Sequence, residues 1–228
     1  MAFVTLPILE RGPALARRSE PTPPGPISAD PDRGLVEDWR AGDPRAFELL
    51  VRRHERKVFG LLLRMLGSRE EAEDAAQETF LNLHRHGHRF RRESRFSTFV
   101  YRVAVNAALN RRRSLGRRRA QMERLGVRQA AGDDLQTQPR GPEDSALGGE
   151  IQNRVQREIQ ALSPTLRAPL VLYDIEGLAY GEIAEVLGVA EGTVKSRIHR
   201  ARKALRDQLR DLVDDPLRDR VDTAGETR

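Results

Sequence analysis

Apolar residues recur every three to four positions along most of the chain from Asp32 onwards, which is the spacing of one face of an α-helix. In the first half of the chain this pattern predicts four helices, near residues 32–41, 44–66, 69–87 and 98–113. No period-two alternation lasts long enough to predict a strand. Four helices with short connections predict a compact bundle of roughly 80 residues.

Capping residues mark the helix boundaries in this half. Asp43 followed by Pro44 is typical of a helix start, because proline fits the first helical position. Ser68 with Glu71 three residues later predicts a capping box for the third helix. Ser97 is predicted to cap the fourth helix.

The helical pattern fades between residues 114 and 149, where Gly, Pro, Gln and Asp accumulate. This segment is therefore predicted to be a flexible linker, with room for a little helix at its start. Helical spacing returns at residues 150–162 and restarts after Ser163-Pro164. It ends in two short amphipathic helices within residues 181–205.

The predicted fold class is therefore all-α, with two small helical domains joined by the linker. The first domain is expected to span residues 30–113 and the second residues 150–213. Residues 1–29 are rich in Pro, Gly and Ser and predict a disordered leader, and residues 214–228 predict a disordered tail.

The two short helices near the end of the chain have the pattern of a helix-turn-helix. Gly188 suits the sharp turn, and Ile183, Leu187, Val189, Val194 and Ile198 are spaced to form one shared core. The second helix then turns a basic face outwards, as this motif does in the major groove of DNA. An ordinary amphipathic hairpin with a solvated basic face is the plainer interpretation, but the small residues and the cationic bias together favour DNA binding. The outward-facing residues are Lys195, Ser196, His199, Arg200, Arg202 and Lys203.

The formal net charge is only +6, but the charges are unevenly distributed. Residues 85–119 hold twelve Arg, no Lys and a single acid, Glu93, so this stretch is expected to attract a polyanion, with nucleic acid as the leading candidate. Residues 70–78 instead hold five acids and no base. Two neighbouring surfaces of opposite sign indicate two different partners.

Aromatic residues alternate with arginines between residues 90 and 106. Rings and guanidinium planes stack on unpaired bases, and an amide such as that of Asn106 can read a base edge. This segment is therefore predicted to bind unstacked bases, although Phe96 and Phe99 are also expected to be core residues.

The sequence shows no catalytic constellation, so no enzymatic activity, cofactor or metal is expected. It has no glycine-rich phosphate loop, no nucleophile elbow and no cysteine that could act as a nucleophile or thiolate ligand. The cluster His84-Arg-His-Gly-His88 resembles a metal site, but its arginines oppose a cation, and a polar helix end is the preferred interpretation. His54 is expected to be a packed histidine. No stretch is apolar enough to predict a signal peptide or a membrane span.

Three motifs resemble the extracytoplasmic-function (ECF) sigma factors, the smallest members of the sigma-70 superfamily of bacterial transcription initiation factors. They are Asp74-Ala-Ala-Gln-Glu-Thr-Phe80, the stretch from Phe90 to Asn106, and Gly192-Thr-Val-Lys-Ser-Arg-Ile-His-Arg-Ala-Arg202. The likeness covers about Leu35–Arg113 and Glu150–Leu212, with the motifs in the family's order. It implies a first domain of the sigma-70 region 2 type and a second of the region 4 type.

The resemblance also implies roles for individual residues. The acidic helix is expected to bind core RNA polymerase through Glu71, Asp74, Gln77, Glu78 and Phe80. The minus-ten promoter element is expected to be recognised and opened by Phe90, Arg91, Ser94, Arg95, Phe96, Tyr101, Arg102 and Asn106, with Asn106 helping to hold a flipped-out base. The minus-thirty-five element is expected to be read by Thr193, Lys195, Ser196, Arg197, His199, Arg200 and Lys203.

The partners implied by the resemblance are core RNA polymerase, promoter DNA and an anti-sigma factor, in the cytoplasm and without membrane insertion of the chain itself. The sequence departs from the family at Ala179, where a Ser or Thr cap is usual. The helix that follows is therefore expected to be less stable by about 1 kcal/mol and to fray at its start. A stand-alone helix-turn-helix repressor or activator is the second hypothesis, but it leaves the acidic helix and residues 90–106 without a role. A metal-dependent nuclease using the cluster His84–His88 is the third.

Overall fold

The computed structural model describes residues 30–87, 90, 94–125 and 146–210, and within these ranges the chain forms helices but no strand. The predicted all-α class is therefore confirmed. The elements in chain order are α1 (Arg33–Arg40), α2 (Pro44–Leu66), α3 (Arg69–His86), α4 (Phe96–Arg124), α5 (Ala146–Ala161), α6 (Pro164–Leu170), the π-helical turn η5 (Val171–Ile175), α7 (Tyr180–Leu187) and α8 (Glu191–Gln208).

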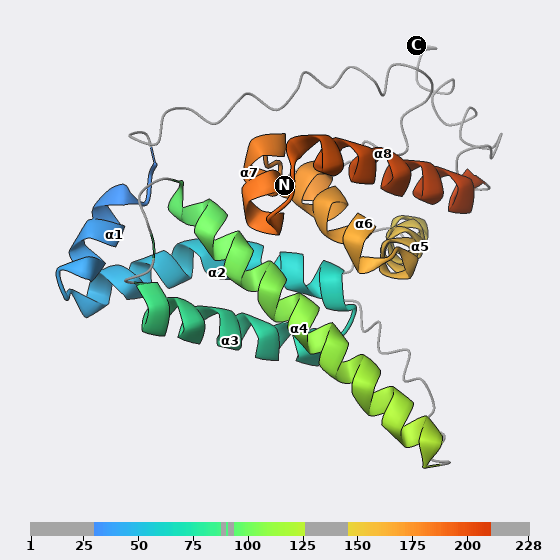
Figure 1. Ribbon diagram of the computed structural model, residues 1–228, viewed down its shortest axis with the longest axis horizontal. Helices are drawn as coiled ribbons and strands as arrows, with labels where there is room; N and C mark the ends of the chain where they lie inside the picture. The colour runs from blue at the N-terminus through green and yellow to red at the C-terminus, as the bar shows by residue number, and fades with distance from the viewer. Residues whose placement is uncertain (1–29, 88–89, 91–93, 126–145, 211–228) are drawn as a thin grey trace, which may run out of the picture.

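The first domain is built on α2, α3 and α4, which pack against one another, with α1 against α2 (Figure 1). Helix α2 begins as predicted, because the carboxylate of Asp43 accepts a hydrogen bond from the Arg45 N–H and Pro44 occupies the first helical position. It ends at Gly67, whose left-handed φ of 82° suits glycine. The fully buried Ala72 and Ala75 let α3 lie close to its neighbours.

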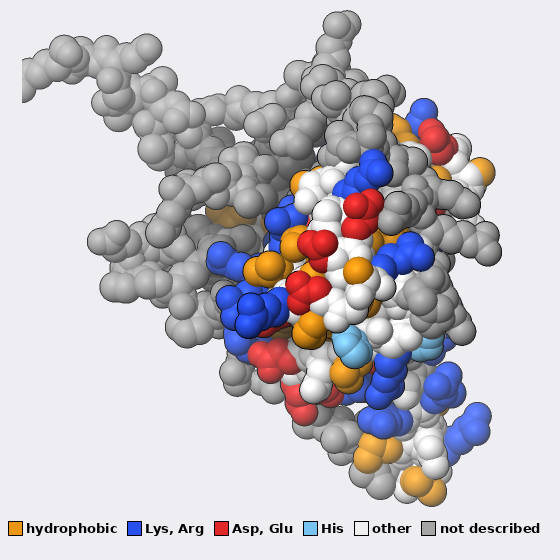
Figure 2. Space-filling view, turned by 90° about the vertical axis from the view of Figure 1, so that its left-hand side faces the viewer, with side chains coloured by type: hydrophobic (Ala, Val, Ile, Leu, Met, Phe, Trp, Pro, Cys, Tyr) orange, Lys and Arg blue, Asp and Glu red, His pale blue; other side chains and the backbone are white. Residues whose placement is uncertain are grey.

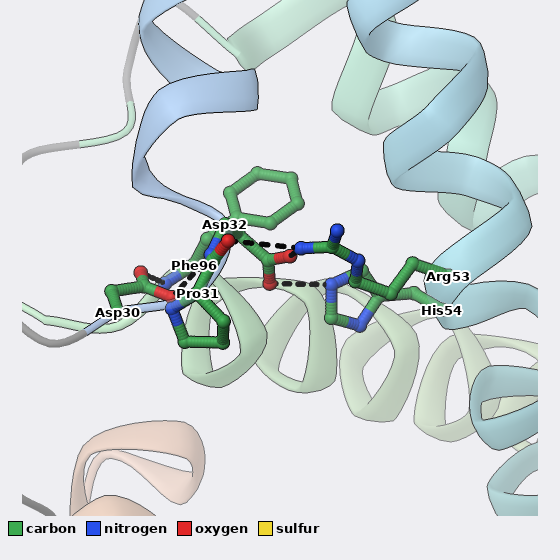
Figure 3. A network of polar contacts seen from close by, with 6 residues as sticks. All are labelled: Asp30, Pro31, Asp32, Arg53, His54 and Phe96. Atoms are coloured by element: carbon green, nitrogen blue, oxygen red, sulfur yellow. Dashed lines mark hydrogen bonds and ion pairs between the residues drawn. The ribbon is translucent and has the colours of Figure 1, made fainter.

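Helix α4 differs from its prediction at both ends. It begins at Phe96, so Ser97 lies inside the helix and is not its cap; the first N–H instead donates to a carboxylate oxygen of Asp30 at 2.7 Å, 66 positions earlier (Figure 3). The helix continues to Arg124, past the predicted end near residue 113, so the first part of the expected linker is helical. The middle of that linker, the leader and the tail lie outside the described residues.

The second domain consists of α5 to α8. Pro169 lies inside α6, where it has no N–H to donate, and the chain continues directly as the π turn η5. The sequence pattern predicted a plain helix here. Gly188 makes the turn between α7 and α8 with a φ of 64°, as expected for a helix-turn-helix.

Side chains of the second domain complete the C-terminal end of α2. The last carbonyls of a helix have no partner within it. Here the buried guanidinium of Arg167 donates to the Met65 carbonyl at 2.5 Å, and the amide of Gln160 donates to the carbonyls of Leu63 and Arg64. A cation at the negative end of the helix dipole adds to this stabilisation. The two domains are therefore joined by backbone capping as well as by apolar contact.

A second polar contact lies beside α4, which also packs against α7. The Tyr101 hydroxyl on α4 donates to the Glu176 carboxylate at 3.0 Å, and Arg64 lies 3.9 Å from the other oxygen of the same carboxylate. Burial raises the pKa of Glu176, although Tyr101 and Arg64 oppose this effect. Tyr101 is 6% exposed, so the second domain covers it in this arrangement.

We expect Gly87→Ala to destabilise the first domain. A Cβ at this position would lie 1.7 Å from a ring carbon of Trp39, and that ring is already packed against Phe47 and Phe96. Overpacking of this kind costs about 1–3 kcal/mol in the free energy of unfolding, measured by denaturant titration. Gly116→Ala is the matched control, because nothing lies within 4 Å of a Cβ there. A Gly87→Ala variant as stable as the wild type would contradict the packing described.

We expect Tyr101→Phe to weaken the contact between the domains, because it removes the hydrogen bond to Glu176 and keeps the ring. A loss of about 1.5 kcal/mol corresponds to about a tenfold shift towards separated domains. The chain has no cysteine, so dyes can be placed through Arg45→Cys and Lys203→Cys and energy transfer between them measured. Tyr173→Phe, which removes a hydroxyl beside Tyr180 within the second domain, is the control. Transfer that is equally efficient in the wild type and Tyr101→Phe would refute the role of this bond.

Candidate functional site

The basic face predicted on the helix-turn-helix lies on the surface of α8. Val194 and Ile198 are buried on the inner side of this helix, and the residues between them turn outwards. The exposed side chains are Lys195, Ser196, His199, Arg200 and Lys203, and Thr193 and Arg197 are half-buried at the edge. Five of the seven residues expected to read DNA are thus open to solvent on one helix face.

Arg202 does not belong to this open face, which corrects the sequence-based prediction. Its guanidinium donates to both carboxylate oxygens of Asp174, one of them at 3.1 Å, and it lies over the Tyr173 ring. The Asp174 side chain is 1% exposed. Because a buried carboxylate needs a partner, Arg202 acts mainly as a structural cation that ties α8 to η5.

Two stacked tyrosines lie beside α8, and neither was among the site residues predicted from the sequence. The rings of Tyr173 and Tyr180 lie 4.6 Å apart and nearly parallel, and Lys195 sits over the Tyr180 ring with its Nζ 5.1 Å from the centroid. A cation over an aromatic face is held in place electrostatically. The structure therefore orients one of the candidate DNA-contacting lysines.

The start of α7 is better held than the sequence suggested. Ala179 has no side-chain acceptor, but the carboxylate of Glu182 accepts a hydrogen bond from the Ala179 N–H at 3.0 Å. This is one half of a capping box. It offsets part of the fraying expected at this end.

The aromatic residues before and within α4 form a buried cluster. Phe90, Phe96 and Phe99 are 5%, 1% and 6% exposed, and Phe90 lies 5.6 Å from Phe96 between ring centroids. The rings are therefore packed against one another and are not open for stacking on bases. Arg102 lies over the Phe99 ring at the edge of this cluster.

The polar candidates of the same region differ in exposure. Asn106 is exposed on α4, whereas Ser94 and Arg95 are half-buried. Tyr101 is covered by the contact with Glu176. Arg91 lies outside the described residues. Asn106 is thus exposed to solvent, whereas most of the aromatic residues that were expected to contact DNA are buried.

The acidic candidates on α3 are divided between paired and open side chains. Arg111 on α4 donates to Glu71 and, at 2.6 Å, to Asp74, so these two carboxylates already have a cationic partner. Gln77 and Glu78 are exposed, and Phe80 packs against the core. Leu81, which the sequence analysis did not select, is 47% exposed on the same helix. Leu81 thus lies beside the exposed polar side chains of Gln77 and Glu78, and these three residues are called the α3 strip below.

The side of the molecule that carries α1 has mixed charges. Acidic and basic side chains lie next to one another over much of this face, and basic ones alone gather at its lower right (Figure 2).

The histidine cluster is not gathered into a metal site among the residues that the structure describes. His84 packs edge-on against the Phe47 ring, and the His86 ring nitrogen lies 3.2 Å from the Asn82 carbonyl oxygen. His88 is outside the described residues. His54 is packed as expected, with its Nε2 2.7 Å from the Asp32 carboxylate. Within the described ranges, none of the helices has the length and apolar character needed to cross a membrane.

Comparison with known proteins places both domains. The model of "Sigma-70 region 2" matches residues 50–118, and the model of "Sigma-70, region 4" matches residues 152–205. The RNA polymerase sigma-H factor of Pseudomonas aeruginosa is 38% identical over 190 residues, covering 82% of this chain and 98% of the relative. The ECF RNA polymerase sigma-E factor of Haemophilus influenzae is 39% identical over 185 residues, covering 80% and 97%.

Solved structures share the fold. The sigma factor RpoE of Bartonella quintana, in complex with the anti-sigma factor NepR, superposes with a TM-score of 0.59 at 21% identity, covering 72% of this chain and 96% of that one. CnrH, in complex with the cytosolic domain of CnrY, gives a TM-score of 0.58 at 24% identity, covering 79% and 97%. With two family models matched in order and relatives that align over four fifths of its length, the chain belongs to the ECF family of RNA polymerase sigma factors.

Proposed function

We propose that this protein binds core RNA polymerase in the cytoplasm, directs it to promoter DNA and promotes promoter opening. The family consists of transcription initiation factors and not of enzymes, in agreement with the sequence analysis. The observation that carries the proposal is the open basic face of α8, which stands in one chain with an exposed acidic and apolar strip on α3. A stand-alone DNA-binding protein has no need of the second surface.

The exposed face of α8 is proposed to read the minus-thirty-five element in the major groove. Lys195 and Arg200 can donate to base edges and phosphates, and His199 lies between them on the same face. The two stacked tyrosines and the pair of Arg202 with Asp174 fix this helix on its domain. Readout by a rigid helix loses little conformational entropy on binding.

Asn106 is proposed to hold an unstacked base of the minus-ten element, because its amide is exposed on α4 and can pair with a base edge. Arg91, Ser94, Arg95 and Arg102 are proposed to contact the same strand. Phe90 and Phe96 are proposed to act indirectly, because their packed rings hold the start of α4 in place. Tyr101 can reach DNA only when Glu176 and the second domain move away from it.

The strip on α3 is proposed to bind core polymerase. Gln77, Glu78 and the exposed Leu81 supply polar and apolar contacts, with Phe80 supporting them from the core side. Glu71 and Asp74 contribute through a carboxylate cluster already centred on Arg111. The sigma factor RpoE in the fold comparison was solved with the anti-sigma factor NepR, and an anti-sigma partner is proposed for this chain as well.

Run-off transcription with purified core polymerase tests the proposal. Core polymerase plus this protein should yield promoter-dependent transcripts from a template that core polymerase alone does not use. Absence of such transcripts on every candidate template, together with operator binding by the protein alone, would favour the stand-alone repressor or activator.

Reversing charge on the α3 strip should weaken polymerase binding. We expect Asp74→Lys combined with Glu78→Lys to raise the Kd for core polymerase at least tenfold, measured by fluorescence anisotropy, because like charges then face the docking site. Glu48→Lys combined with Glu55→Lys, on exposed positions of α2, is the matched control. Equal affinities of the two double variants would remove the strip from the docking surface.

Asn106→Ala should impair promoter opening more than promoter binding. Closed-complex formation depends on phosphate and duplex contacts, whereas the amide acts only on an unstacked base. We expect about a tenfold loss of permanganate reactivity with less than a threefold loss in a gel shift. Asn110→Ala, one turn further along α4 and equally exposed, should match the wild type. Equal losses in both assays for Asn106→Ala would contradict its role.

A further inference from the structure

Residues 30–32, which directly precede α1, contact both α2 and the start of α4 in the first domain. One Asp30 carboxylate oxygen accepts the Phe96 N–H at the start of α4, and the other accepts the Asp32 N–H at 3.1 Å. The Asp32 carboxylate, which is 1% exposed, contacts His54 at 2.7 Å and Arg53 at 2.6 Å on α2. Arg53 also donates to the Pro31 carbonyl at 2.9 Å. Figure 3 shows these six residues meeting between α1, α2 and α4. We call residues 30–32 the clasp.

The clasp holds its own geometry as well as that of α4. Burial by itself would raise the pKa of Asp32, but the hydrogen bonds and charges of His54 and Arg53 outweigh it and lower the pKa. Asp32 therefore stays ionised and remains bound to α2. Because Asp32 is fixed to α2, Asp30, two residues earlier, is held in position to accept the Phe96 N–H at the start of α4.

The first turn of α4 takes its carboxylate cap from Asp30. The N-terminal N–H groups of a helix have no partner within it, and a carboxylate there also favours the helix dipole. The Phe96 ring next to this bond is 1% exposed and packs edge-on against His54. Asp30 and the buried ring thus fix both the backbone and the side chain of the residue at which α4 begins.

The position of this turn matters for the proposed DNA contacts. Ser94 and Arg95 directly precede Phe96, and Asn106 lies on the same helix. The α3 strip and the α8 face lie on other elements and take no bond from the clasp. Loss of the Asp30 contact is therefore expected to displace Ser94, Arg95 and the first turn of α4 while leaving the polymerase-docking and upstream DNA surfaces in place.

We propose that Asp30 is a positioning residue for promoter opening, which acts by holding the first turn of α4, with Ser94 and Arg95 directly ahead of it, in the geometry that receives the opened strand. This inference rests on the proposed function. The clasp lies before both segments that match the family models. The inference therefore assigns a function in the first domain to residues outside those segments.

The test compares Asp30→Ala and Asp30→Asn in the full-length protein. Asparagine keeps an acceptor oxygen, whereas alanine removes it. Asp43→Ala is the matched control, because it removes the equivalent aspartate cap from α2. For each variant, permanganate reactivity of the minus-ten region, closed-complex gel shifts and the Kd for core polymerase are measured. Hydrogen exchange of the Phe96 amide is measured in the free protein.

We expect Asp30→Ala to lower permanganate reactivity about tenfold, with polymerase binding and closed-complex formation changed less than about threefold. Asp30→Asn should restore opening to within about threefold of the wild type, and Asp43→Ala should lower opening no more than it lowers closed-complex formation. Exchange of the Phe96 amide should be faster in Asp30→Ala than in Asp30→Asn.

Two results would overturn the inference. One is wild-type opening by Asp30→Ala. The other is a loss that Asp43→Ala reproduces to the same extent, which would indicate a general stability effect. If the wild-type protein gives no polymerase-dependent opening, the proposed function fails. In that case faster exchange at Phe96 in Asp30→Ala still reports whether the clasp holds α4.

Discussion

Two helix ends in this protein, the start of α4 and the end of α2, take hydrogen-bond partners from distant parts of the chain, and the arrangement of the two domains depends on these contacts. A buried helix end with unsatisfied backbone groups is costly, since each lost partner leaves a desolvated N–H or C=O. The start of α4 is satisfied by Asp30, and the end of α2 by Gln160 and Arg167 of the second domain. The first contact fixes where α4 begins. The second fixes the second domain against the first.

Two further contacts explain why the two proposed DNA-reading surfaces differ in accessibility. The face of α8 is open, because its inner side is filled by its own domain and by the pair of Arg202 with Asp174. The region around Tyr101 is covered, because the second domain supplies Glu176 to its hydroxyl. In the proposed function the helix-turn-helix supplies the upstream part of promoter recognition, while opening depends on α4 and the loop ahead of it.

Features that depend on neighbours in the sequence could be predicted, and features that depend on distant partners could not. The start of α2 follows from Asp43 and Pro44, and the turn before α8 from Gly188, because these signals act within a few residues. The cap of α4 was assigned to Ser97 because the true partner lies 66 positions away. Arg202 was placed on the DNA face because helical spacing cannot reveal a buried aspartate 28 positions earlier. The burial of Phe90 likewise results from packing against other aromatic rings.

The central claim is that one chain contacts two separate promoter elements, a duplex element through α8 and an opened strand through α4. The most direct measurement is site-specific photocrosslinking of promoter DNA in the holoenzyme, with the reactive group placed at Arg200 in one preparation and at Asn106 in another. We expect an upstream crosslink from position 200 and a downstream crosslink from position 106, the latter on the strand whose bases become reactive to permanganate. Crosslinks from both positions to the same element, or a downstream crosslink formed equally well without polymerase, would contradict it.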